Sequence, residues 1–580
     1  MPKTGVSNPA EEAGQRALNS VFQCIREHKN FRLEAGAGAG KTYSLIKALK
    51  HVINEQGAIL LQKKQQVACI TYTNVATGQI ISQIDGHPAA YCSTIHAFCW
   101  LLIKNFQPFL RQKLAIVNER WPEMLEEIGG IGQRRVEYDL GYRRAKKDDP
   151  KVYLHHDDIL AFTILLMEQK KFRNLLSARF PILFIDEYQD TNVDFAQSII
   201  KYFIASEEGP LIGLFGDSWQ KIYGTGCGSI EHPNLTSIGK KANFRSLKTI
   251  VDVLNRIRPE LPQEVKDPDS TGSIAVYHSN DWSGVRRSGS HWAGDLPAED
   301  AHKYLESVRH LLEGEGWDFS PGKTKILMLT HSILAAEQKY SGLIGVFRYS
   351  DDLIKKANPY ISFLVDTVEP VSIAYKNGRY GEMLSVLGGN SLSIKTLDDK
   401  RAWARDMNKL LELRNSGTIG QIIDHLKNVK RPRLSDAVIN TESKLSKASP
   451  EEIAESRTFM ETNKLKEIPY QEIVSVAEYL NEHTPFSTKH GVKGAEFENV
   501  MVVLGRGWNQ YDWNKFLEMS LNGIPSNKVE FYERNRNLFY VACSRPKVRL
   551  ALLFTQQLSQ TAIETLTQWF RAENIHAHIV

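Results

Sequence analysis

The sequence Glu34-Ala-Gly-Ala-Gly-Ala-Gly40-Lys41-Thr42 follows a short apolar segment, residues 31–33, and precedes a helical pattern that begins near residue 43. Its alternating glycines can adopt positive φ and carry no Cβ, so successive backbone N–H groups can curl into a nest for an anion. The lysine supplies a cation for the β and γ phosphates, and the threonine supplies a hydroxyl for Mg²⁺. The stretch predicts a nucleoside triphosphate cradle, with a plain Gly/Ala-rich turn as the alternative, made of Ala35, Gly36, Ala37, Gly38, Ala39, Gly40, Lys41 and Thr42.

Length and composition are those of a soluble enzyme with several domains. The chain has 580 residues, 42% hydrophobic and 24% charged. This length is too great for one core and predicts about three or four domains. The sequence has no apolar run near the roughly 18 residues that a membrane span requires, and residues 1–9 lack the apolar region of an export signal. We therefore expect a cytoplasmic protein with no membrane partner.

Cysteine spacing and charge exclude some classes of site and leave others open. The six cysteines form no CxxC pair, which argues against a zinc ribbon, an iron–sulfur cluster and a disulfide framework. The net charge is +5, and two basic clusters, residues 143–147 and 427–433, fit either a polyanion track or solvated loops. Residues 155–158 (His-His-Asp-Asp) resemble a metal cluster, but ligands adjacent in sequence point apart, so we expect this stretch to lead into a helix.

Two acidic residues follow the buried strand predicted at residues 181–185. Asp186 can hold Mg²⁺ through its water shell, and Glu187 can orient and deprotonate an attacking water. A purely structural role is the weaker alternative, because burying two unpaired carboxylates costs several kcal/mol. Gln220 follows the next strand, residues 211–216, and is placed to sense the γ-phosphate.

The remaining pattern alternates strands and helices, which predicts an α/β fold. The strand of residues 66–70 ends in Thr71-Tyr72-Thr73-Asn74, and in an open parallel sheet this loop lies on the same rim as the phosphate loop. A second alternation begins after residue 246, with strands at 273–278, 325–330 and 499–504 and a helix at 530–543. Residues 105–155 and 345–480 interrupt the pattern and are predicted to be mainly helical insertions.

The order of these motifs resembles that of the superfamily 1 helicases of the UvrD/Rep/PcrA type. Residues 35–42 are similar to the family's AGAGSGKT, residues 71–74 to TFTN, residues 94–98 to TFHS and residues 185–191 to VDEFQDT. Residues 216–220 are similar to GDDDQ, residues 243–246 to NYRS, residues 488–497 to TLHxxKGLEF and residues 540–545 to YVGVTR. The ordered set indicates the family more strongly than any single match.

The resemblance implies two RecA-like P-loop domains in tandem, with ATP between them. The first domain would comprise residues 1–104 and 156–242 with insertion 105–155, and the second residues 243–344 and 481–580 with insertion 345–480. By the resemblance, Gln15 and Phe244 would hold the adenine and Glu496 the ribose. Arg245 and Arg545 would be arginine fingers that stabilise the charge developing on the γ-phosphoryl group.

The resemblance also implies that single-stranded DNA is held by phosphate hydrogen bonds and base stacking. Thr225 stands where the family usually has a base-stacking tryptophan, and both insertions are short, which leaves strand separation open and points to a partner protein. The DNA contacts would come from Thr71, Tyr72, Thr73, Asn74, His96, Tyr223 and His490.

Two functions from different classes follow. The first is an ATP- and Mg²⁺-dependent single-stranded DNA translocase or helicase, moving 3′ to 5′ by resemblance. The alternative is a regulatory ATPase subunit that senses DNA ends or nucleotide for a separate nuclease. The compact chain resembles the helicase half of bacterial anti-phage systems such as Gabija, whose companion is an OLD-type nuclease. A P-loop kinase is a weaker third possibility, because the sequence shows no phosphoryl acceptor site.

Overall fold

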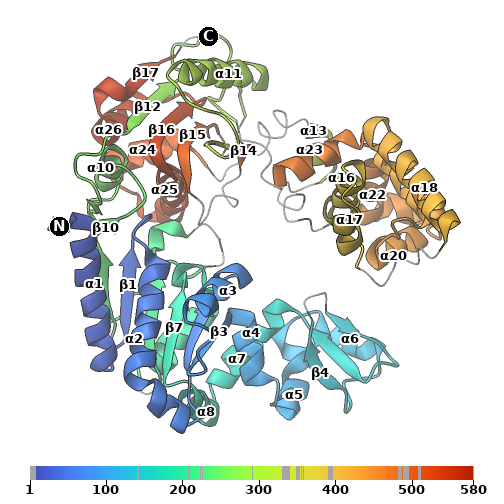
Figure 1. Cartoon of the computed structure of the whole chain (residues 1–580), viewed down its shortest axis with the longest axis horizontal. Helices are drawn as coiled ribbons and strands as arrows, with labels where there is room; N and C mark the ends of the chain where they lie inside the picture. The colour runs from blue at the N-terminus through green and yellow to red at the C-terminus, as the bar shows by residue number, and fades with distance from the viewer. Residues whose placement is uncertain are drawn as a thin grey trace. The chain divides into compact units, whose positions relative to one another are not determined.

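The computed structural model describes most of the chain, and it divides into two compact units (Figure 1). Unit 1 comprises residues 1–274, 522–549 and 567–571, and unit 2 comprises residues 275–521, 550–566 and 572–580. The described residues are 8–139, 143–206, 209–221, 224, 226–289, 292–328, 340–347, 353, 356, 358–388, 396–480, 486–487, 496–506, 511–578 and 580.

Unit 1 is built on a parallel sheet whose strand order is β3-β2-β7-β8-β1-β9. The carboxyl ends of β1, β7 and β8, which lie side by side, carry the phosphate loop, the acidic pair and the loop that ends in Gln220. The strands are β1 (Phe31–Ala35), β2 (Val67–Thr71), β3 (Ala90–Thr94), β7 (Ile182–Asp186), β8 (Leu211–Gly216) and β9 (Thr236–Lys240).

Helices cover both faces of this sheet, which explains why its central strands β7 and β8 are continuous apolar runs. Along β7, Phe184 packs into the core formed with α1 and α2, whereas Leu183 and Ile185 pack into the core on the opposite face. The helices of the sheet are α1 (Pro9–Arg26), α2 (Lys41–Gln62), α3 (Asn74–Gln83), α4 (Ile95–Ile103), α7 (His156–Met167), α8 (Lys170–Arg179) and α9 (Val193–Ile199).

The first insertion contains a small sheet as well as helices. Helices α5 (Gln107–Val117) and α6 (Trp121–Glu127) are followed by three short strands in the order β4-β6-β5. The strands were not predicted, because each has at most four residues, too few for an alternating pattern to be recognised; they are β4 (Arg135–Tyr138), β5 (Arg144–Ala145) and β6 (Lys151–Leu154). The fully buried Trp121 belongs to the same apolar core as Phe162 of α7. This shared core attaches the insertion to the rest of unit 1.

Two further helices complete unit 1. They are α10 (Lys248–Ile257) and α25 (Val529–Cys543). Along the chain, α10 connects two short strands that pair with each other, β10 (Ala242–Asn243) and β11 (Glu264–Val265). Residues 243–274 and 522–549 thus pack within the unit that holds the phosphate loop, although the resemblance assigned them to a second domain. The domain limits given above remain a prediction.

Unit 2 contains a second six-stranded sheet of order β14-β13-β15-β16-β12-β17, in which the β13–β14, β13–β15 and β12–β17 pairs are parallel. Helix α11 (Ala298–Gly314) packs on it through Tyr304, Leu305 and Val308. The remaining elements are β12 (Ser273–His278), β13 (Thr324–Met328), β14 (Phe486–Ser487), β15 (Phe497–Leu504), β16 (Pro546–Phe554), β17 (Ile575–Ala577), α24 (Trp513–Asn522) and α26 (Gln560–Phe570).

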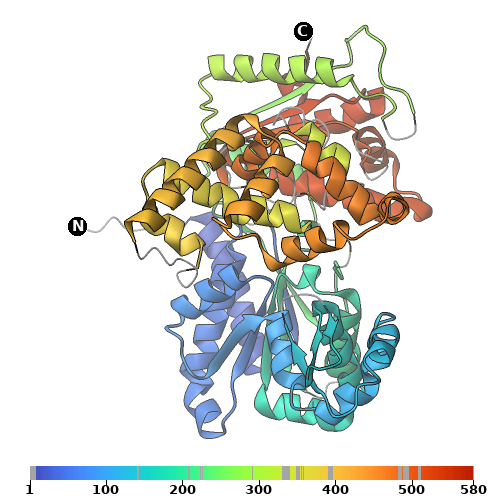
Figure 2. The same ribbon diagram turned by 90° about the vertical axis from the view of Figure 1, so that its right-hand side faces the viewer.

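The second insertion is helical throughout its described residues, as expected, and Figure 2 shows its yellow and orange helices gathered in one group. They are α13 (Ser341–Val346), α15 (Pro359–Phe363), α16 (Glu369–Lys376), α17 (Tyr380–Val386), α18 (Leu397–Ser416), α19 (Ile419–Val429), α20 (Asp436–Leu445), α21 (Pro450–Glu455), α22 (Arg457–Glu467) and α23 (Gln471–Leu480). None of the helices in the described part of the chain has the length and apolar character of a membrane span.

Candidate nucleotide site

The phosphate loop has the backbone that its glycines predict. Gly38 and Gly40 have φ angles of 75° and 70°, and Gly40 is the N-cap of α2. A Cβ on Gly38 would lie 2.6 Å from Asn243 Oδ1, so this position requires glycine for space as well as for conformation. The loop therefore presents backbone N–H groups and the amino end of α2, which is the arrangement that binds phosphate.

The acidic pair at the end of β7 lies beside the phosphate-loop lysine. Glu187 Oε2 is 2.8 Å from Lys41 Nζ, and Asp186 is 6% exposed. Burial alone would lower the pKa of Lys41, but the carboxylates of Glu187 and Asp186 outweigh it and raise this pKa. Glu187 adopts the left-handed region with a φ of 48°, a strained conformation that occurs preferentially at functional sites.

The donor set suits a hard divalent cation. Asp186 contributes a carboxylate and Thr42 contributes a partly exposed hydroxyl at the first turn of α2. Oxygen ligands with remaining positions for water and phosphate are the usual surroundings of Mg²⁺ in nucleotide sites. The residues present therefore fit the metal that the sequence predicts.

Gln220 lies between the acidic pair and the arginine at the end of α25. Its Nε2 donates to Asp217 Oδ2 at 2.7 Å, and its Oε1 accepts from Arg545 Nη2 at 3.3 Å. Asp217 in turn donates its backbone N–H to Gln189 Oε1 at 3.1 Å, and Gln189 Nε2 donates to Glu187 Oε2 at 2.5 Å. A chain of hydrogen bonds thus joins Glu187 to Arg545.

The two predicted arginine fingers lie close to the phosphate loop and to each other. A Cβ on Gly38 would lie 2.9 Å from Arg245 Cβ, and Arg245 Nη1 donates to the Ser544 carbonyl at 3.1 Å. Arg545 is 1% exposed, and burial together with the nearby charge of Arg245 lowers its pKa. A buried guanidinium next to a half-buried one favours an anionic ligand between or beside them.

The residues expected at the adenine meet on one side of the loop. A Cβ on Gly14 would lie 3.4 Å from Phe244 Cζ, so Phe244, which is 39% exposed, packs against α1 next to Gln15. Gln15 Nε2 donates to Asn19 Oδ1 at 2.8 Å. Tyr43, which the sequence analysis did not single out, is 59% exposed at the first turn of α2 and offers a second aromatic ring. Glu496, expected at the ribose, is an exposed residue of unit 2, and its role remains a prediction.

A buried lysine beside the loop was also missed. Lys240 is 2% exposed, and its Nζ donates to the Gly40 carbonyl at 3.1 Å and to Ser44 Oγ at 2.7 Å. Its ammonium lies 5.9 Å from the centre of the Tyr43 ring and 5.6 Å from that of Phe244. Burial lowers the pKa of Lys240 to about 8. The sequence signal was a lysine ending a strand immediately before the Asn243 motif.

Several predicted DNA contacts line a single cavity. The cavity has a volume of about 300 Å³, and Thr71, Tyr72 and His96 line it together with Asp186 and Glu187. Thr73 caps α3, and Asn74 is exposed at the start of that helix. Burial and the nearby His156 lower the pKa of His96 to about 4, so its ring is neutral at pH 7. Tyr223 and His490 lie outside the described residues.

Some residues of the charged clusters noted in the sequence form contacts within the fold. Residues 155–158 lead into a helix, as expected, with His155 as the N-cap of α7, and the described residues contain no group of three or more His, Cys, Asp or Glu that could hold a metal ion. Arg143 pairs with the buried Asp158 at 2.8 Å, and Arg431 pairs with Asp406 at 2.8 Å. Neither arginine is therefore available for an extended polyanion track.

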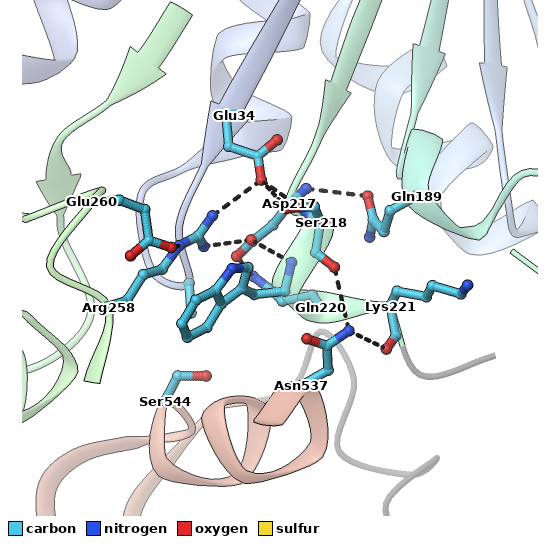
Figure 3. Close-up of polar contacts among 12 residues, drawn as sticks. Glu34, Gln189, Asp217, Ser218, Gln220, Lys221, Arg258, Glu260, Asn537 and Ser544 are labelled. Atoms are coloured by element: carbon cyan, nitrogen blue, oxygen red, sulfur yellow. Dashed lines mark hydrogen bonds and ion pairs between the residues drawn. The ribbon is translucent and has the colours of Figure 1, made fainter. Parts of the chain in front are cut away.

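Behind the loop that ends in Gln220 lies a buried ion network that the sequence analysis did not anticipate (Figure 3). Arg258, 3% exposed, bridges Asp217 and Glu34, with distances of 2.6 Å from Nη1 to Asp217 Oδ1 and 3.1 Å from Nη2 to Glu34 Oε1. The only sequence signal was the charged Glu34 at the end of an otherwise apolar strand; nothing singled out Arg258.

Comparison with known proteins finds one family and several relatives to which this chain is similar. Residues 18–226 match the family described as "AAA domain". The Gabija protein GajB of Bacillus cereus strain HuB5-5 is 24% identical over 95% of this chain and 96% of its own length. A second Gabija protein GajB, from strain VD045, is 23% identical over 95% and 98%. The ATP-dependent DNA helicase Rep of Buchnera aphidicola subsp. Baizongia pistaciae (strain Bp) is 27% identical over 38% of this chain and 40% of its own.

Proposed function

The chain belongs to the UvrD/Rep-like superfamily 1 helicases and is of the Gabija type, and from this premise we propose that it is an ATP-driven translocase or helicase on single-stranded DNA. The observation that carries the proposal is the group around the phosphate loop, in which Lys41, Glu187, Gln220 and Arg545 are joined within one compact unit. Such a group has the cations and the base that phosphoryl transfer to water needs.

In this proposal the contacts of Lys41 and Glu187 change in a defined way when triphosphate enters. Lys41, now 2.8 Å from Glu187, would turn to the β and γ phosphates, because the nucleotide carries more negative charge than one carboxylate. Glu187 would then accept a proton from the attacking water. Thr42 and Asp186 would hold Mg²⁺, which would supply charge neutralisation for the triphosphate.

Arg245 and Arg545 would stabilise the charge that develops on the γ-phosphoryl oxygens. Removing such an arginine costs about 10³- to 10⁵-fold in rate. The amide of Gln220 fits a sensor, because one N–H is committed to Asp217 while its carbonyl accepts from Arg545, which leaves the second N–H for a phosphoryl oxygen. The adenine would stack on Phe244, with Gln15, Tyr43 and Lys240 close to the base.

Coupling to DNA is proposed through the cavity lined by Thr71, Tyr72 and His96. This cavity also contains Asp186 and Glu187, so a strand held there would touch the segment that holds the catalytic acids. The neutral ring of His96 suits stacking or hydrogen bonding rather than charge pairing. Movement from 3′ to 5′ is proposed from the family resemblance.

The test is ATP hydrolysis with and without single-stranded DNA. Lys41→Ala and Glu187→Gln should each reduce DNA-stimulated turnover about 10²-fold or more. The matched controls are Lys50→Ala, on the exposed face of α2, and Glu168→Gln, exposed after α7. Ordinary turnover in either site variant would contradict the cradle or the base assignment. Strand displacement on 3′-tailed and 5′-tailed duplexes then tests unwinding and direction.

A second candidate is a regulatory ATPase subunit of an anti-phage complex with a separate nuclease. Similarity to Gabija proteins over almost the entire chain favours it. By the family resemblance, the companion would be an OLD-type nuclease. Co-purification with the product of an adjacent nuclease gene, together with little strand displacement by the isolated chain, would support this candidate. Full unwinding by the chain alone would count against it.

A further inference from the structure

Arg258 occupies an unusual place for a charged residue. It directly follows α10, is 3% exposed and lies 4.9 Å from the ring centre of Trp219 and 5.6 Å from that of Tyr540. Figure 3 shows its guanidinium between the carboxylates of Glu34 and Asp217. Burying a guanidinium is costly unless its partners are placed well, so the site holds Arg258 through specific contacts.

The charges of the network depend on one another. Burial alone would lower the pKa of Arg258, but Asp217, Tyr540 and Glu34 outweigh burial and raise it. Burial would likewise raise the pKa of Glu34, but hydrogen bonds from Tyr188 and Ser218, together with the charge of Arg258, lower it. Arg258 therefore adds to the hydrogen bonds that keep the Glu34 carboxylate ionised, and it forms an ion pair with Asp217 as well.

Asp217 is the point at which this network meets the nucleotide site. One carboxylate oxygen accepts from Arg258 at 2.6 Å and from the backbone N–H of Trp219 at 3.1 Å. The other accepts from Gln220 Nε2 at 2.7 Å. Because the carboxylate is planar, the contact of Arg258 with the first oxygen also orients the second oxygen. The second oxygen accepts from Gln220 Nε2, which turns the Gln220 carbonyl toward Arg545.

The short helical turn Ser218–Gln220 is held from two sides. Glu34 Oε1 accepts from the backbone N–H of Ser218 at 2.8 Å and from its hydroxyl at 2.7 Å. On the other side, Asn537 of α25 donates to the Lys221 carbonyl at 3.2 Å, and the guanidinium of Arg536 stacks 4.1 Å from the ring centre of Trp219. The turn therefore has little freedom while Arg258 is in place.

We propose that Arg258 is a positioning residue for ATP hydrolysis, acting through Asp217 to fix the Gln220 amide against Arg545 and the γ-phosphate. The inference rests on the proposed function of the same site. Arg258 itself touches neither nucleotide nor water in this role. Lysine cannot replace it fully, because a single ammonium lacks the planar fork that bridges two carboxylates.

The experiment measures ATP affinity and turnover separately. Arg258→Met should lower kcat by about 10- to 100-fold, whereas binding of a fluorescent non-hydrolysable ATP analogue should change by less than about 3-fold. Arg258→Lys should recover part of kcat. The matched control is Arg414→Met, which removes a half-buried arginine that pairs with the buried Glu369 at 2.8 Å in the second insertion and should leave turnover unchanged.

A double-mutant cycle with Gln220 separates positioning from general support of the fold. If Arg258 acts through Gln220, then Arg258→Met should have little further effect on kcat in a Gln220→Ala background. An equal loss in both backgrounds, or a loss confined to analogue binding, would overturn the inference. If Arg258→Met does not fold, the same cycle is run with Arg258→Lys.

The Lys41→Ala variant tests the proposed function separately. If this variant still hydrolyses ATP normally, the proposed function is wrong. If Arg258→Met has a normal kcat, only the inference about Arg258 is wrong.

Discussion

Replacing Lys240 by methionine should stabilise the protein measured without nucleotide and should weaken nucleotide binding. The ammonium is 2% exposed and contacts the Gly40 carbonyl, Ser44 Oγ and two aromatic rings. Burial lowers its pKa from 10.5 to about 8. At ~1.4 kcal/mol per tenfold change in proton affinity, holding this charge costs the folded state about 3 kcal/mol at pH 7.

The sign of the pH dependence follows from the lowered pKa. Between about pH 8 and 10.5 the unfolded chain binds more protons at this lysine than the folded one, so wild-type stability rises with pH there. Lys240→Met removes the cost entirely. The gain in the free energy of unfolding of Lys240→Met over wild type should be largest below pH 8 and should disappear near pH 10.5. At every pH, the hydrogen bonds that the variant loses reduce this gain by about 1 kcal/mol each.

Thermal unfolding of the nucleotide-free protein at pH 7 and pH 10 measures this effect, with Lys241→Met as the matched control because the adjacent Lys241 is exposed. An ATP analogue should bind the Lys240→Met variant less tightly, since the buried cation lies beside the loop that takes the triphosphate. A variant that is less stable than wild type at pH 7, or an advantage that persists at pH 10, would refute the reasoning that burial dominates at this lysine.

Two further predictions concern the same site. Arg545→Ala and Arg245→Ala should retain binding of an ATP analogue but lose about 10³-fold or more in kcat, because an arginine finger acts on transition-state charge; loss of binding with normal kcat would show that neither is a finger. Phe244→Ala should raise the KM for ATP by about 10-fold with kcat nearly unchanged, since stacking on a base contributes about 1–3 kcal/mol; Phe22→Ala, on α1, is the control, and an unchanged KM would place the adenine elsewhere.

The elements that the sequence predicted well have strong local signals. The apolar run before Asp186 forms β7, and the glycine-rich stretch joins β1 to α2 with the expected positive φ at Gly38 and Gly40. Each of these features depends on residues within one turn or strand, so no knowledge of distant contacts is required. The predicted α/β fold with two sheets and a largely helical second insertion is confirmed.

The features that were missed depend on contacts between distant segments. Strands β3 and β9 carry half-buried or exposed residues such as Tyr91 and Ser237, so they lack the continuous apolar run of β7. Arg258 resembles any surface arginine after an amphipathic helix until the fold brings Glu34 and Asp217 to it. The interpretation of the basic clusters as a possible polyanion track fails similarly for Arg143, whose partner Asp158 is fully buried.

The contact between Lys41 and Glu187 gives the proposed cycle a physical starting point. While the two charges lie 2.8 Å apart, Glu187 Oε2 is engaged in an ion pair with Lys41. In the proposed cycle, triphosphate would draw Lys41 away, and Glu187 would then accept the proton of the attacking water. Gln189 donates a hydrogen bond to Glu187 and accepts one from the backbone N–H of Asp217. In the proposed cycle, a change at Glu187 would therefore alter the hydrogen bonds that lead to Gln220. In the proposed cycle, nucleotide would therefore have to arrive at the loop before any residue moves toward DNA.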